Sequence, residues 1–220
     1  MSVVGIWLLG AGAAMLGAAS ARPLGDMLVP ERRARRAAAR LRRTDAASVR
    51  PGELVKIVGR VSHVHDSLAA PLSKRVCAHY SARVEAEAPR GWKVVAEEKR
   101  TQSFVVTDDT GDVLVDTVRV AVDVVIDHEW NPKEADVETR FDLDGFLYQL
   151  GVTKPPEGSR VKLRYREGAL EEGETVTVVG VAALGEAFGV GLGYRDTGRA
   201  LTISAPRGGR VFVSDGMHYA

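Results

Sequence analysis

The clearest structural signal in the chain is the stretch Phe104-Val105-Val106-Thr107-Asp108-Asp109-Thr110-Gly111-Asp112-Val113-Leu114-Val115. Two short runs of mostly β-branched residues flank a polar turn that ends in glycine, which is the pattern of a β-hairpin. Aspartate side chains bond to backbone N–H groups in such turns, and glycine adopts backbone angles that other residues avoid. Residues 104–115 therefore predict two antiparallel strands joined by a tight turn.

Alternation of apolar and polar residues continues on both sides of this hairpin. It predicts strands at residues 54–61, 76–84, from 92 to 95, 118–126 and 161–165. Segment 52–59 is echoed by 173–180, since each has an entry glycine, alternating apolar residues and a second glycine that suits a bend. One internal helix is predicted near residues 143–150. The pattern predicts a mostly β fold, a small curled sheet or barrel, with the OB fold as one candidate architecture.

The N-terminal residues have a different composition. Residues 2–21 carry no charge, and a helix of this length reaches about 30 Å, the thickness of the hydrocarbon core of a bilayer. Residues 1–21 are therefore predicted to be a transmembrane anchor. Small residues spaced by four, such as Gly10, Ala14 and Ala18, suit close approach of two helices, so a homo-oligomer through this segment is one expectation.

A basic stem follows at residues 22–50. Seven arginines lie between residues 32 and 43, and the Ala/Arg/Leu composition predicts a helix there. By the positive-inside rule this single-pass anchor places the remaining domain, residues 51–220, in the cytoplasm beside the cell membrane. Residues 2–43 are then expected to contact membrane lipids. The alternative is a signal peptide cleaved after Ala19-Ser20-Ala21, which would lead to export.

Charge is distributed unevenly along the chain. The net charge of +1 combines a value of +6 for residues 1–50 with −5 for the rest. Because the domain is mildly acidic, no nucleic-acid partner is predicted.

Four residues are candidates for a metal site: His63 and His65 in one predicted strand, Cys77 and His79 in another. Side chains two residues apart share one face of a strand, so neighbouring strands would bring the two pairs together. One sulfur with three histidines is an unusual structural zinc set, however, and no metal is predicted. The glycines of 189–193 lack the strand and helix of a dinucleotide-binding loop. No cofactor and no catalytic residue is therefore predicted.

Several short strings occur in an order and spacing that resemble a known family. They are Val58-Gly59-Arg60-Val61, Leu68-Ala69-Ala70-Pro71-Leu72-Ser73, Cys77-Ala78-His79-Tyr80, Trp92, the hairpin 104–115 and Tyr165-Arg166-Glu167. From about Pro51 to Asp215 the chain resembles the GIDE domain, also called the beside-a-membrane (BAM) domain. The residues matching its motifs are Pro71, Ser73, Cys77, Tyr80, Trp92, Asp108, Gly111, Tyr165, Arg166 and Glu167.

The resemblance implies ubiquitin-protein transfer, since the family is known from a mitochondrial RING-type ubiquitin-protein ligase as well as from prokaryotic proteins. In that ligase a zinc-binding RING recruits the charged enzyme, whereas this sequence has a single cysteine. The expectation is a prokaryotic-type member without the RING, acting as a membrane-anchored binding, scaffold or sensor module for an unidentified protein partner. The alternative is an E3 ubiquitin ligase family protein that acts only with a separate RING component. Enzymatic activity is left open, with binding favoured.

Overall fold

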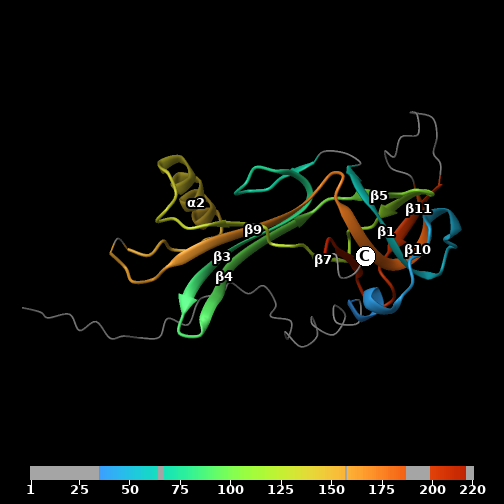
Figure 1. Ribbon diagram of the computed structural model, residues 1–220, viewed down its shortest axis with the longest axis horizontal. Coiled ribbons are helices and arrows are strands. Elements are labelled where there is room, and N and C mark those ends of the chain that lie inside the picture. Colours follow the sequence, from blue (N-terminus) through green and yellow to red (C-terminus); the bar gives the residue numbers. More distant parts are fainter. Residues whose placement is uncertain (1–34, 64–66, 157, 187–198, 217–220) are drawn as a thin grey trace, which may run out of the picture.

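The computed structural model describes residues 35–63, 67–156, 158–186 and 199–216. These residues form a mostly β structure with one short internal helix, as predicted. The arrangement is elongated (Figure 1). A compact group of strands lies at one end, and the long strands β3 (Val76–Ala88), β4 (Gly91–Thr101) and β9 (Leu163–Glu171) extend from it towards helix α2 (Val137–Gln149).

Five strands close into a barrel. Their order around it is β1 (Leu54–His63), β5 (Phe104–Asp108), β6 (Gly111–Val115), β11 (Arg199–Ser204) and β10 (Thr175–Glu186), and β10 pairs again with β1. Among these five strands, only the β6–β11 pair is parallel. The predicted hairpin 104–115 is confirmed as β5 and β6, in which Phe104 pairs with Val115. Two further strands, β12 (Val211–Ser214) and β7 (Val120–Asp123), extend the sheet from β10.

Two glycines allow the barrel strands to change neighbours. A Cβ on Gly59 would lie 2.4 Å from the carbonyl oxygen of Thr107, and one on Gly180 would lie 2.8 Å from that of Ser204. Gly59 adjoins the residue at which β1 turns from β10 to β5, and Gly180 lies where β10 turns from β12 to β11. These are the second glycines of the two echoed segments, so the predicted bends are confirmed. The echoed segments themselves pair with each other as β1 and β10.

The barrel core consists largely of valine and isoleucine. Ile57, Phe104, Val106, Val178 and Ile203 are fully buried in it. Burial of each such side chain contributes about 1.5–3 kcal/mol relative to exposure. The alternating pattern that predicted these strands therefore also identified the residues that stabilise the barrel.

The second sheet, here called the long sheet, is built around β3, which pairs with β4 and β9 along its two edges. Short strands β2 (Leu68–Ala69) and β8 (His128–Trp130) complete it. Helix α2 covers one face of this sheet, and its Leu143, Phe146 and Leu147 pack against Tyr80 and Tyr165.

Several predicted elements differ from the structure in length. The strand predicted over 161–165 is β9, which begins at Leu163 and continues to Glu171, and the strand predicted over 76–84 continues to Ala88. Helix α2 begins six residues before the predicted start, because the Asp136 side chain accepts a hydrogen bond from the Thr139 N–H at 2.7 Å and caps the helix. The strand predicted over 118–126 is limited to β7, which pairs in parallel with β12.

The later part of the basic stem packs against the barrel. Residues 35–40 are helical, and Ala38 is fully buried against Val179 and Phe212. Ala46, in the short 3-10 helix η1 (Ala46–Ser48), belongs to the barrel core. The predicted anchor at 1–21 lies outside the described residues. Among the residues that are described, no helix has the length and apolarity needed to span a bilayer.

Candidate functional site

A buried carboxylate lies at the point where the long sheet meets the barrel. Glu167 on β9 is fully buried. Its two oxygens accept hydrogen bonds from the N–H of Leu72 at 2.9 Å and of Ser73 at 3.1 Å, and the Ser73 hydroxyl also donates to it. Three hydrogen bonds to one carboxylate compensate for the cost of its burial. Glu167 therefore fixes the connection between β2 and β3, which contains the motif residues Pro71 and Ser73.

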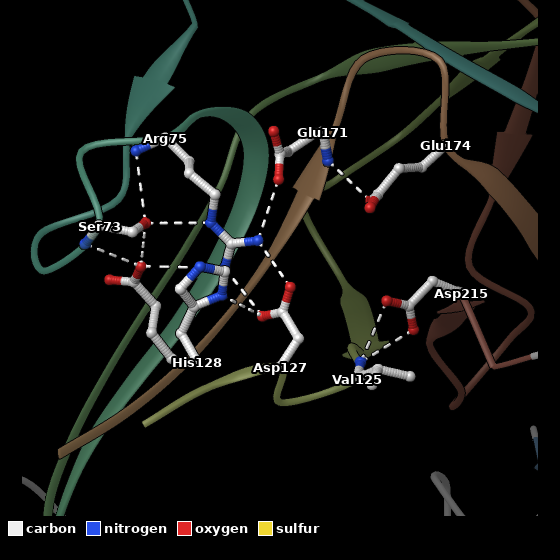
Figure 2. Close-up of polar contacts among 9 residues, drawn as sticks. Ser73, Arg75, Val125, Asp127, His128, Glu171, Glu174 and Asp215 are labelled. Atoms are coloured by element: carbon white, nitrogen blue, oxygen red, sulfur yellow. Dashed lines mark hydrogen bonds and ion pairs between the residues drawn. The ribbon is translucent and has the colours of Figure 1, made fainter. Parts of the chain in front are cut away.

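Arg75 extends this cluster towards β8 and the end of β9 (Figure 2). Its guanidinium donates to both carboxylate oxygens of Asp127 at 2.7 and 2.9 Å and to Glu171 at 2.9 Å, and its Nε donates to Ser73 Oγ at 3.0 Å. Burial alone would raise the pKa of Asp127, but hydrogen bonds from Arg75 and His128 lower that pKa below its usual value. The cluster thus has both charge signs and well-defined geometry.

Cys77 and His79 do not form a metal site together. A β-bulge between them changes the register with β9. Cys77 consequently packs in the apolar cluster under α2, whereas the His79 Nδ1 lies 2.7 Å from Thr101 Oγ1 of β4. The expectation that the two side chains share one strand face is wrong for this physical reason. The side chain of His63 and all of His65 lie outside the described residues.

The Cys77 thiol has low reactivity. It is fully buried, and its Sγ lies 3.8 Å from the carbonyl oxygen of Leu68. Burial, with the negative charge of Glu167, raises the pKa of this thiol to about 11. Since the thiolate is the reactive form, Cys77 is a poor nucleophile at neutral pH.

Two more carboxylates lie near this cluster, in segments next to the ends of barrel-sheet strands (Figure 2). Glu174 accepts a hydrogen bond from the N–H of Glu171 at 2.9 Å, and Asp215 accepts one from Val125 at 2.9 Å. Burial raises the pKa of both groups. With Asp127 they line a cavity of about 430 Å³. Within the described ranges, no group of three or more His, Cys, Asp or Glu side chains is arranged to hold a metal ion.

The cluster around Glu167 and the hairpin 104–115 contain three of the six strings on which the resemblance rests. A sequence profile described as GIDE, E3 ubiquitin ligase, matches residues 74–204, more than half of the chain. The chain belongs to the GIDE family. No curated protein and no solved structure matches the chain significantly.

The other GIDE motif residues take structural positions. The Tyr80 ring is buried and its hydroxyl donates to Glu98 Oε1 at 2.8 Å. Asp108 accepts hydrogen bonds from Thr110 and Gly111 in the β5–β6 turn and from the N–H of Ala46. Tyr165 is buried under α2, and Arg166 forms an ion pair with Glu129 at 3.2 Å.

Trp92 stands apart from these residues, at the far end of the long sheet. It is 39% exposed, and the Arg164 guanidinium lies 4.3 Å from its ring centroid. This places a cation over an aromatic face. Trp92 belongs to a surface that the sequence analysis did not identify.

That surface is a cavity of about 470 Å³, here called the distal groove. It lies between the start of β9, helix α2 and residues 154–156 and 158–162, and apolar residues in its lining include Trp92, Leu147, Leu163, Pro155 and Pro156. Five basic residues line it against two acidic ones. Sequence reasoning missed the groove because its residues come from segments that are far apart in the chain.

Proposed function

We propose that this GIDE protein is a membrane-anchored recognition module of a ubiquitin-ligase system, in which a separate RING-bearing component supplies the transfer chemistry. The observation that carries the proposal is the state of Cys77. A thioester mechanism requires a reactive thiolate, whereas this thiol is fully buried and its pKa is raised to about 11. The family match supports the link to ubiquitin ligases.

The architecture supports a binding role. The barrel order β1-β5-β6-β11-β10, with its single parallel pair, is the strand order of an OB barrel. OB barrels are widely used as binding scaffolds whose specificity comes from strand faces and loops. Here the chain between β1 and β5, together with the chain between β6 and β10, builds the long sheet and its distal groove.

The anchor is the second part of the proposal. The uncharged residues 2–21 and the arginines that follow support a single-pass protein whose domain faces the cytoplasm. We expect the full chain to remain in the membrane pellet after an alkaline carbonate wash, with the domain protected from protease added on the outer side. A mature protein beginning at Arg22 would instead support export after cleavage.

The decisive test of the recognition role is a conjugation assay. The full chain in nanodiscs, supplied with ubiquitin-charged carrier enzyme, should form no conjugates alone and should direct conjugation to its partner when a RING-bearing protein is added. A Cys77→Ser variant should behave like the wild type in both arms. Conjugation by the chain alone, lost in Cys77→Ser, would overturn the proposal.

The same thiol provides an independent readout. Native Cys77 should react with a thiol reagent much more slowly than after denaturation, because burial suppresses the thiolate. Rapid labelling of the folded chain would contradict the assignment of Cys77 to the core.

A further inference from the structure

Among the described residues, Leu163, the first residue of β9, has no strand paired with it on the side away from β3. The carbonyl of Lys162 accepts a hydrogen bond from the Glu87 N–H at 2.9 Å, so it points towards β3. Backbone groups of successive strand residues point to opposite sides, so those of Leu163 point away from β3, towards the groove. Strand β8 pairs only with Tyr165, Arg166 and Glu167 and therefore ends before this position. Such an open edge is a template for an added strand.

The charges around this edge favour an acidic ligand. Three of the five basic residues have carboxylate partners: Lys154 pairs with Asp144, Lys162 with Glu87, and Arg164 with Glu85 and Glu129. The other two, Lys133 and Arg140, are exposed, and within the described residues neither forms an ion pair within 4 Å of a carboxylate. The Arg140 guanidinium donates to the Ala135 carbonyl at 2.9 Å. Hydrogen bonds from Thr139, with a smaller contribution from the charge of Arg140, lower the pKa of the exposed Asp136 at the start of α2.

An apolar surface adjoins the groove. Val137, Phe141 and Tyr148 are 84, 78 and 86% exposed. Their spacing places them on one side of α2, opposite the buried Leu143 and Phe146. Arg140 and Asp144 lie between this exposed stripe and Leu147, at the wall of the groove. A ligand that follows the β9 edge therefore has both cations and apolar surface within reach.

We propose that the distal groove binds an extended, acidic segment of a partner protein, which pairs with the β9 edge at Leu163. Its carboxylates contact Lys133 and Arg140, and an apolar side chain between them enters the groove beside Leu147 and Trp92. The inference rests on the proposed recognition role and specifies its partner class. A concave groove with an open strand edge suits a peptide better than a flat lipid surface.

The test uses the full chain in detergent micelles and fluorescence anisotropy. The probe is a fluorescein-labelled peptide in which glutamate and valine alternate around one central leucine. The double variant with Lys133→Glu and Arg140→Glu should bind it about tenfold more weakly than the wild type. The matched control reverses Arg90 and Lys93, two exposed cations of the neighbouring β3–β4 hairpin that do not line the groove. This control should change the affinity by less than twofold.

Three further arms test the mode of binding. A peptide with lysine in place of glutamate should not bind, and a glutamate peptide N-methylated at alternate residues should lose binding in the register that faces β9. Anionic vesicles should not compete for the groove. Equal loss in the hairpin control, equal binding of the lysine peptide, or preferential binding of vesicles would each overturn the proposal. Because these arms involve no conjugation, their failure is distinguishable from failure of the recognition role itself.

Discussion

In the described part of the chain, the barrel has no open strand edge between its first and last strands, whereas one edge of the long sheet is only partly covered. In the barrel, β1 and β10 pair with each other, so the ring of five strands closes and its interior is apolar. In the long sheet, β8 stops short of the start of β9, and the face opposite α2 carries charged residues such as Arg83, Glu97 and Arg166. A closed edge protects against added strands, whereas an open edge accepts them.

This difference separates stability from recognition. The barrel is stabilised by burial of valine and isoleucine. In the long sheet, the Glu167 cluster fixes the β2–β3 connection and the Asp127 segment against β9. The distal groove lies at the other end of that sheet and carries exposed cations and apolar side chains. Substitutions near Glu167 should therefore affect folding, and substitutions at the groove should affect binding.

The largest expected effect on stability is at the Glu167 cluster. Glu167→Ala removes the acceptor for the Leu72 and Ser73 N–H groups and leaves them without their partner in the interior. We expect a loss of about 3–5 kcal/mol in the free energy of unfolding. Chemical denaturation measures it, with Glu129→Ala as a half-exposed control. A loss no larger than that of the control would show that the cluster does not stabilise the β2–β3 connection.

The next effect concerns the core of the sheet. Tyr80→Ala removes a buried ring and its hydrogen bond to Glu98. The expected loss is about 2–4 kcal/mol, in the range of other large-to-small core changes. Thermal unfolding at matched concentration checks it. An unchanged melting temperature would mean that the face under α2 contributes little to stability.

A pH dependence is expected from His79. Burial, together with the nearby charge of Lys99, lowers the pKa of His79 to about 4. The unfolded chain takes up this proton near pH 6.5, so stability is complete above that pH and is lost as the pH falls towards 4. His79→Gln should reduce the slope of unfolding free energy against pH within this window. An identical slope in the variant would show that His79 does not remain neutral in the folded state.

The smallest effect on stability is predicted at the groove. Lys162 pairs with Glu87 at 3.0 Å, and both side chains are about half exposed. Lys162→Ala should change the free energy of unfolding by less than about 0.5 kcal/mol, because exposed ion pairs contribute little. It should still weaken binding of the acidic peptide. A large loss of stability would remove the distinction between the two regions.

Local patterns predicted much of the fold and little of the recognition surface. The hairpin 104–115 and the bends at Gly59 and Gly180 are encoded in short segments, so periodicity and glycine placement were sufficient. The bulge beside Cys77 and the distal groove depend on how distant strands pair. The start of α2 could have been predicted locally, because Asp136 is a typical N-cap residue. The prediction of residues 143–150 rested on apolar periodicity and did not take this residue into account.

The two long segments between barrel strands, from β1 to β5 and from β6 to β10, also affect how the chain folds. His63 pairs with Phe104, and the N–H of Gly173 donates to the carbonyl of Val61 at 2.8 Å, so each segment must return close to the end of β1. The β5–β6 hairpin needs only local contacts, but the pairing of Leu54 with Val181 joins opposite parts of the chain. Loop-closure entropy opposes such distant contacts until many form together. We therefore expect slow folding, in which the hairpin forms early and closure of the barrel between β1 and β10 limits the rate.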